Sequence, residues 1–307
     1  INANPKYIGT RLSNGYSVIV PTQTLVDTYR CTDGKRIDQS SLYNPKSPYQ
    51  NRDPRLDYSI ICPGGWHNNF KFEIHPDSTK TSAIINGKLT RIGNTEVTNA
   101  YGSFTGYVGR KYFDEADLPD YISKSELHFI LLRYAEVLLT YAEAKIELNE
   151  IDDATLEAMN RVRARAYGVQ HTETDKYPAI VTRNQSELRT ILRTERRMEF
   201  AFERLRIYDL LRWRIAEKVL NYSDWTIKYN AGANVLKKVM TDGQWFIPTP
   251  AIDESGCPEM DATFSRENRP HITALYNRVF NPEIHYLWPL PATDVLVNKN
   301  LKQNYGY

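Results

Sequence analysis

The chain of 307 residues is long enough to bury a substantial core, either as one large unit or as two lobes. Its 39 basic and 37 acidic residues leave a formal net charge of +2, which creates no field that would attract nucleic acid or an anionic membrane surface. We therefore expect no nucleic-acid partner.

The three cysteines, Cys31, Cys62 and Cys257, lie far apart, and the six histidines are scattered. Neither a disulfide framework nor a zinc site is predicted, although a secreted protein could still pair two of the thiols. No apolar stretch approaches the length of a membrane span, and the residues from Ile1 onward show neither a signal peptide nor a lipid-anchor cysteine. We expect a mature form of the protein, a truncated form, or one whose first residues are missing from this sequence.

Residues 1–122 are rich in Gly, Asn, Thr, Pro and Tyr, with short alternating runs at residues 16–20 and 82–85. This texture predicts short strands and long loops. In residues 123–214 Gly and Pro are scarce and apolar residues recur at helical spacing, which predicts a helical block. Residues 215–307 return to a proline-rich, irregular texture and are expected to wrap the helices as loops.

The first predicted helix covers residues 130–149, and its apolar stripe contains Tyr134, Val137, Leu138, Tyr141 and Leu148. Small alanines nearby allow a neighbouring helix to approach closely.

Asp152 and Asp153 are placed to cap a second helix, which passes through Met159 and Val162 and stops at Gly168. A third helix opens near Asn184, whose spacing to Glu187 resembles a capping box, and is predicted to continue through Phe202 to Leu205. Helices of this length joined by a tight turn fit a repeat unit of the tetratricopeptide kind.

Five groups of motifs, in the same order and spacing, resemble the SusD/RagB family. They are the helix motif at 132–144, the basic run at 160–166, the glutamate- and arginine-rich run at 195–213, the upstream group at 21–22, 25–27, 33–34 and 51–56, and the closing groups at 288–291 and 300–307. Nearly the whole chain is covered, but it corresponds only to the C-terminal half or more of a family member. One departure is Arg204, where the family commonly has glycine; as arginine suits a helix, the fold is still expected.

The resemblance implies a mainly α fold, with tetratricopeptide-type helical repeats covered by long loops and short strands. It also implies a non-catalytic, lipid-anchored protein on the outer membrane of Bacteroidetes-type bacteria, forming a lid over a SusC/RagA-like TonB-dependent transporter. Its ligand would be a glycan oligomer or, in the RagB-type alternative, a peptide. The lipid anchor would lie outside these residues, and no cofactor is implied.

An enzyme is the alternative class, because Glu195 and Glu199 fall on adjacent turns of the third helix, on its apolar stripe. A glycosidase needs two carboxyls on either side of the scissile bond, a placement that one helix does not readily provide. Several arginines could instead hold these carboxylates as structural ion pairs, namely Arg133, Arg161, Arg163, Arg165, Arg196 and Arg197. We favour the structural interpretation.

Metal binding is not predicted. The acidic run at Asp114, Glu115 and Asp117 could contact calcium, but it offers fewer oxygens than the six to eight that calcium requires.

A glycan or peptide site needs exposed aromatic rings beside side chains that satisfy polar groups. The best candidate is Trp66-His67-Asn68-Asn69, because the preceding Gly64 and Gly65 can expose the ring. Further candidates are Tyr43 and Tyr49 around a proline-containing loop and Tyr101 in an aromatic and glycine-rich run. Each tyrosine could instead anchor a loop over the core, which we favour for them individually, whereas Trp66 remains open between the two roles. Trp213 and Trp288 are expected to pack into the core.

Overall fold

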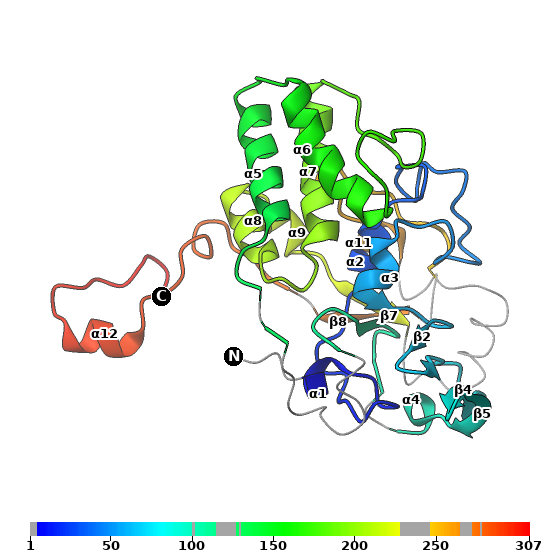
Figure 1. Cartoon of the computed structure of the whole chain (residues 1–307). Helices are drawn as coiled ribbons and strands as arrows, with labels where there is room; N and C mark the ends of the chain where they lie inside the picture. Colours follow the sequence, from blue (N-terminus) through cyan, green and yellow to red (C-terminus); the bar gives the residue numbers. More distant parts are fainter. Residues whose placement is uncertain are drawn as a thin grey trace.

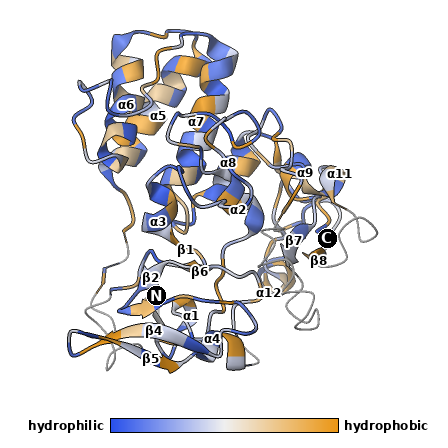
Figure 2. Ribbon diagram, turned by 90° about the vertical axis from the view of Figure 1, so that its right-hand side faces the viewer, coloured by the Kyte–Doolittle hydropathy of each residue, from blue (hydrophilic) through white to orange (hydrophobic). Residues whose placement is uncertain are grey.

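The structure, a computed structural model, describes residues 5–99, 102–114, 127–128, 130–227, 246–264, 272–276 and 278–307. Three long helices, α5 (Tyr134–Glu147), α6 (Asp153–Ala166) and α7 (Gln185–Glu199), form the upper part of the molecule in Figure 1, with short strands below them. Figure 2 shows the same separation from the side, with α5 and α6 at one end and β4 and β5 at the other. The predicted mainly helical class with short strands is confirmed.

The core of the helical part lies between α5, α6 and α7. Helix α5 begins at Tyr134 and buries one face made of Ala135, Leu139, Ala142 and Ile146. These residues repeat at intervals of three and four, and the two alanines let α6 approach closely. The predicted stripe is therefore wrong: Tyr134, Val137, Tyr141 and Leu148 are exposed, and only Leu138 of that set packs against the core.

The ends of α6 follow from its sequence. The Asp152 side chain accepts a hydrogen bond from the Thr155 backbone N–H at 2.8 Å, and the Thr155 hydroxyl completes a capping box. After the helix, Gly168 adopts φ +68°, a left-handed conformation that stops the helix and that glycine adopts without steric penalty. The predicted cap at Asp152 and the predicted stop at Gly168 are both confirmed.

Helix α7 begins as predicted, because the Asn184 side chain accepts from the Glu187 backbone N–H at 3.0 Å. Its predicted end is wrong: the helix stops at Glu199, and a separate helix α8 covers Arg206–Arg212. Between them Phe202 and Arg204 adopt φ +66° and +64°. Arg204 therefore holds the conformation that glycine favours, at the position where a glycine was expected from the resemblance.

The lower part contains one antiparallel sheet in the order β2 (Trp66–His67), β3 (Phe70–Lys71), β4 (Lys80–Ile85) and β5 (Lys88–Gly93). Asn86 and Gly87 turn β4 into β5 with φ +51° and +73°, as a two-residue hairpin loop requires. The strand predicted at residues 82–85 is confirmed. The strand predicted at residues 16–20 is wrong, because Ser17 is left-handed and the Val18 and Ile19 N–H groups bond to Tyr7 instead of a strand.

Two further antiparallel pairs join distant segments: β1 (Ile60–Ile61) with β6 (Val108–Gly109), and β7 (Asp224–Ile227) with β8 (Ile272–Tyr276). Seven short helices complete the described elements: α1 (Pro5–Ile8), α2 (Gln23–Thr28), α3 (Arg55–Ser59), α4 (Thr95–Thr98), α9 (Ala216–Val219), α11 (Met260–Thr263) and α12 (Ala292–Val297). Within the described residues, no helix combines the length and the apolar character needed to cross a membrane.

The C-terminal segment behaves differently from the prediction. Helix α12 buries none of its residues, and the segment that carries it projects away from the helices in Figure 1. Trp288, which was expected to pack into the core, is 64% exposed, so that prediction is wrong. The local order comes from within the segment, where Gln303 and Leu290 exchange two hydrogen bonds. Trp213 is half-buried and donates its indole N–H to Glu143 at 2.6 Å.

Candidate functional site

The strongest candidate for a ligand surface is the hairpin formed by β2 and β3. Trp66 pairs with Lys71 and His67 with Phe70, and Asn68 and Asn69 make the two-residue turn with φ +47° and +60°. Asparagine tolerates this left-handed conformation better than most residues, so the two asparagines suit the backbone turn itself. The sequence therefore fixes a tight hairpin whose strand carries Trp66.

The hairpin holds the Trp66 ring outward. Successive side chains of a strand point to opposite faces, so Trp66 is 41% exposed while His67 is 2% exposed. The His67 ring packs against Phe113 at 4.6 Å between centroids. Arg110 donates to the Trp66 carbonyl oxygen at 2.7 Å, which ties the strand to the body of the protein. The result is an aromatic ring presented by a backbone that is fixed on both sides.

The two glycines before Trp66 have separate roles. Gly64 adopts φ +86° and donates its N–H to the Phe72 carbonyl oxygen at 2.8 Å. A Cβ at Gly65 would lie 3.0 Å from the Cys62 carbonyl oxygen, which is tighter than ordinary van der Waals contact. Both positions therefore favour glycine, and together they place the strand so that the ring points away from the core.

The other predicted site residues fall into different environments. Asn69 is exposed and Asn68 half-buried, both next to Trp66 in the turn. The burial of His67 against Phe113 removes it from any ligand surface, so including it among the ligand-contacting residues has to be corrected. Tyr101 lies outside the described residues.

Tyr43 and Tyr49 belong to two different core clusters, neither of which contains Trp66. Tyr43 packs under the Arg52 guanidinium at 5.5 Å, and the Tyr49 hydroxyl lies 3.1 Å from that of Tyr107. Burial raises the pKa of both phenols. These contacts are those of residues that anchor loops over the core.

The two carboxylates that suggested an enzyme are enclosed by arginines. Glu195 is fully buried, and its two oxygens bind Arg55 at 2.7 Å and Arg163 at 2.8 Å. Burial alone would raise the pKa of Glu195, but the charges of Arg163 and Arg55 outweigh it and lower the pKa to about 2. A carboxylate held ionised in this way has no proton to donate as a general acid.

Glu199 is held in the same manner. It binds Arg133 at 2.6 Å, Arg165 at 2.5 Å and Arg55 at 3.2 Å. Burial opposes ionisation, yet the arginines lower its pKa below the ordinary value. The predicted structural pairing is thus confirmed for Arg133, Arg163 and Arg165.

The remaining predicted arginines have other neighbours. Arg161 pairs with Glu157, Arg196 pairs with Asp209, and Arg197 approaches Cys257. The partner that sequence reasoning missed is Arg55, which joins both glutamates and also binds Asp53 at 2.7 Å. The sequence did offer one indication of Arg55, because this residue lies in the motif at residues 51–56.

The acidic run that was considered for calcium is described only in part. Asp114 is exposed, and its predicted companions Glu115 and Asp117 lie outside the described residues. Within the described part of the chain, no group of three or more His, Cys, Asp or Glu residues is arranged to hold a metal ion. Cys31, Cys62 and Cys257 are buried free thiols.

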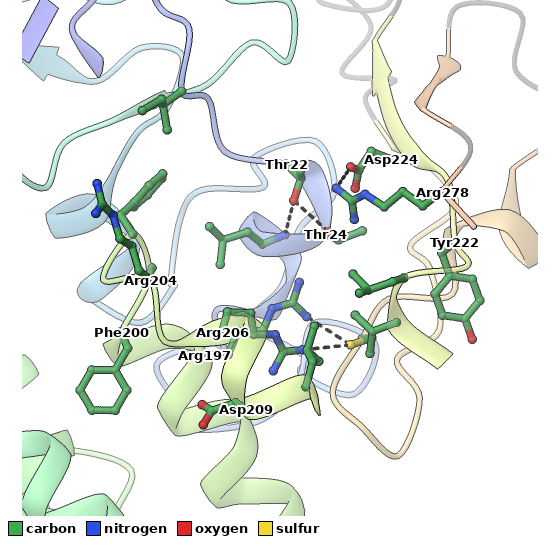
Figure 3. A pocket seen from close by; sticks show the side chains of 18 of the residues that line it. Thr22, Thr24, Arg197, Phe200, Arg204, Arg206, Asp209, Tyr222, Asp224 and Arg278 are labelled. Carbon is green, nitrogen blue, oxygen red and sulfur yellow. Dashed lines mark hydrogen bonds and ion pairs between the residues drawn. The ribbon is translucent and has the colours of Figure 1, made fainter. Parts of the chain in front are cut away.

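A cavity of about 590 Å³ lies at the C-terminal end of α7, and sequence reasoning did not anticipate it. Its walls come from segments that are far apart in the chain, including α2, α8 and the residues around Cys257 (Figure 3). None of the predicted site residues that the structure describes lines it, and neither does Glu195 or Glu199.

Comparison with known proteins gives a consistent result. The model of the SusD family matches residues 1–307. A SusD-like protein P2 from Formosa agariphila is 37% identical over 116 residues, which are 36% of this chain and 22% of that protein. A SusD-like protein from Bacteroides ovatus is 34% identical over 139 residues, 41% of this chain and 23% of that protein. The comparisons indicate no enzyme family.

The fold agrees with solved structures. A SusD-like carbohydrate-binding protein from Bacteroides fragilis superposes with a TM-score of 0.71 and 26% identity, over 97% of this chain and 51% of that one. A second SusD-like protein from Bacteroides fragilis has a TM-score of 0.60 at 23% identity, over 96% of this chain and 48% of that one. The chain therefore spans about half the length of these solved structures. Both curated relatives come from Bacteroidetes, as the sequence resemblance implied.

Proposed function

The chain belongs to the SusD family, and from this premise we propose that it binds glycan oligomers without changing them, so that they can be imported through a SusC-like TonB-dependent transporter. The protein would act at the outer membrane surface, held by a lipid anchor outside these residues. Residues 1–122 would face the ligand and residues 123–214 would form the helical-repeat block. Of residues 215–307, the part that precedes the projecting segment with α12 would wrap around this block.

The observation that carries this proposal is the outward-facing Trp66 ring. A sugar ring laid against an indole removes its apolar C–H face from water, and amides such as that of Asn69 can satisfy nearby hydroxyls. A rigid hairpin lowers the entropy lost when the ligand binds, because the ring is already in place. The similarity to a carbohydrate-binding protein over 97% of this chain supports the choice of glycans over other ligands.

The absence of a catalytic step is supported by the arginine network. Glu195 and Glu199 are the carboxylates whose spacing suggested an acid/base pair, and both are occupied by charge-assisted hydrogen bonds. Incubation with a library of oligosaccharides should therefore return each one intact by mass spectrometry. Sustained release of products that disappears in Glu195→Gln would overturn this part of the proposal.

The binding test compares two tryptophans. Glycan and peptide arrays first identify a ligand; calorimetry then measures its affinity for wild type, Trp66→Ala and Trp288→Ala. We expect Trp66→Ala to weaken binding about thirtyfold, corresponding to about 2 kcal/mol for a central aromatic contact. Trp288→Ala is the control, since it removes another exposed ring, 64% exposed against 41% for Trp66, from the C-terminal segment.

One result would contradict the role of Trp66 in binding, and another would contradict glycans as the ligand class. Unchanged affinity of Trp66→Ala together with a lowered melting temperature would make Trp66 a packing residue. Binding restricted to the peptide array would replace glycans by peptides as the ligand class. The partner is tested separately: purification from detergent-solubilised outer membrane should recover a stoichiometric barrel subunit, because a lid must bury more than about 1,200 Å² to form a stable complex.

A further inference from the structure

The cavity at the end of α7 combines apolar walls with an excess of positive charge. Its apolar lining includes Ile8, Leu25, Phe202, Val219 and Leu220. Its charged lining consists of five arginines and two aspartates, namely Arg196, Arg197, Arg204, Arg206, Arg278, Asp209 and Asp224. Figure 3 shows Arg197 and Arg206 side by side in the cavity, with Asp209 below them. The lining of the cavity is therefore apolar over much of its surface and positively charged where the arginines lie.

Both aspartates are already paired. Asp209 binds the Arg196 guanidinium at 3.0 Å and Arg212 at 2.8 Å. Asp224 forms an ion pair with Arg278 across the opposite side of the cavity (Figure 3). Both aspartates are thus bonded directly to other arginines, and neither forms a direct ion pair with Arg197 or Arg206.

In the part of the chain that the structure describes, Arg197 and Arg206 make only long contacts to acceptors. Arg197 Nη1 lies 3.4 Å from Cys257 Sγ and 3.5 Å from the Gly256 carbonyl oxygen, and Arg206 Nη2 lies 3.6 Å from the same sulfur. No carboxylate among the described residues lies within ion-pair distance of either guanidinium. Sulfur is a weak hydrogen-bond acceptor, so the two guanidiniums converge on one sulfur and on no described carboxylate within ion-pair distance.

The positive charges of Arg197 and Arg206 repel each other. Burial, followed by the charge of Arg197, lowers the pKa of Arg206 to about 10, which still leaves it cationic at neutral pH. Arginine forms its strongest interactions with planar oxyanions, which accept two parallel hydrogen bonds. An anion placed between these guanidiniums would relieve their repulsion and take up donors that the sulfur satisfies poorly.

We propose that this cavity binds a monocarboxylate carried on an apolar body, with the acid group between Arg197 and Arg206 and the apolar part against the walls. Convergent polar groups at one end of an apolar pocket are the usual design of a small-molecule site. A free oligosaccharide fits it poorly, because its hydroxyls would meet the apolar walls without acceptors or donors. The site is therefore separate from the Trp66 surface.

Octanoate is a suitable probe, with 1-octanol as its uncharged analogue and acetate as the same acid without the apolar body. Calorimetry on the wild-type protein should show octanoate binding at least about tenfold more tightly than either analogue, because a hydrogen bond to a charged group contributes about 1.5–3 kcal/mol. Octanoate should also raise the melting temperature in a concentration-dependent manner.

Two variants and one control locate the site. Arg197→Gln and Arg206→Gln should each weaken octanoate binding by about tenfold or more while leaving 1-octanol unaffected. The control is Arg189→Gln, a half-buried position on the same helix α7 that is paired with Glu147 at 2.7 Å and does not line the cavity. This variant should bind octanoate like the wild type. Trp66→Ala should also leave octanoate binding unchanged, which separates this site from the glycan surface.

Equal affinity for octanoate and 1-octanol would overturn the proposal, because the guanidiniums would then contribute nothing. Unchanged octanoate binding in both arginine variants would overturn it as well, since the acid would lie elsewhere. If a variant fails to fold, the comparison of octanoate with its two analogues on the wild type still decides the matter. Failure of glycan binding would leave this result untouched.

Discussion

Arg55 Nη1 and Glu195 Oε1 lie 2.7 Å apart, although 140 residues separate them in the chain. Their side chains are 5% and 0% exposed, so the pair is cut off from water. It joins α3, in the loop-rich half of the chain, to α7 in the helical half. Two charges in this position cost desolvation energy, and each needs its partner to remain buried.

Removing one charge of this pair should destabilise the protein. We expect Glu195→Gln to lower the free energy of unfolding by about 3 kcal/mol, because Arg55 and Arg163 would stay buried with less compensation. Urea denaturation at neutral pH measures the difference. The control is Glu147→Gln, which breaks an exposed pair with Arg189 and should cost less than about 1 kcal/mol. Equal losses in the two variants would contradict the prediction.

The same pair predicts a dependence of stability on pH. The pKa of Glu195 is about 2 in the folded protein against an ordinary value of 4.5, so the unfolded chain binds a proton more readily. Its contribution, about 3 kcal/mol, is complete above pH 4.5 and is lost as the pH falls toward 2. The difference in unfolding free energy between wild type and Glu195→Gln should therefore narrow as the pH is lowered from about 6 to 3. A difference that stays constant over this range would show that Glu195 is not the group responsible.

The turn between α7 and α8 offers a stabilising substitution. Arg204 adopts φ +64°, where a side chain costs roughly 1 kcal/mol relative to glycine. We expect Arg204→Gly to raise the free energy of unfolding by up to about 1 kcal/mol, measured by urea denaturation. Arg189→Gly is the matched control, because a glycine within right-handed α7 should instead lower stability by about 1 kcal/mol. Losses in both variants would indicate that the Arg204 side chain contributes contacts that outweigh its backbone strain.

Local signals in the sequence located the helix starts well. Asp152 and Asn184 satisfy backbone N–H groups within three residues of themselves, and Gly168 ends α6 through its own conformation. Each of these features depends on neighbours in the sequence, so the residues themselves predict it. The fold class followed because five motifs occur in order along nearly the whole chain.

Other features depend on segments that are distant in the chain and could not be inferred in the same way. Helix α5 has apolar side chains on two faces, and only the approach of α6 and α7 decides which face is buried. The turn that follows α7 contains two left-handed residues, Phe202 and Arg204, a conformation that helix propensity does not predict for either of them. The glycines made an exposed Trp66 possible but left its role open, and the burial of His67 required knowing that Phe113 packs against it.

The length of the hairpin loop determines which of two adjacent aromatic side chains faces outward. Trp66 and His67 are adjacent, one facing solvent and the other the core, and the two-residue Asn68-Asn69 turn fixes which is which. A slip of one residue in the pairing of β2 with β3 would exchange their sides, sending an indole inward and an imidazole outward. The length of the loop, as well as the presence of tryptophan, is therefore what makes this surface aromatic. A single-residue insertion would alter its chemistry without changing one of its side chains.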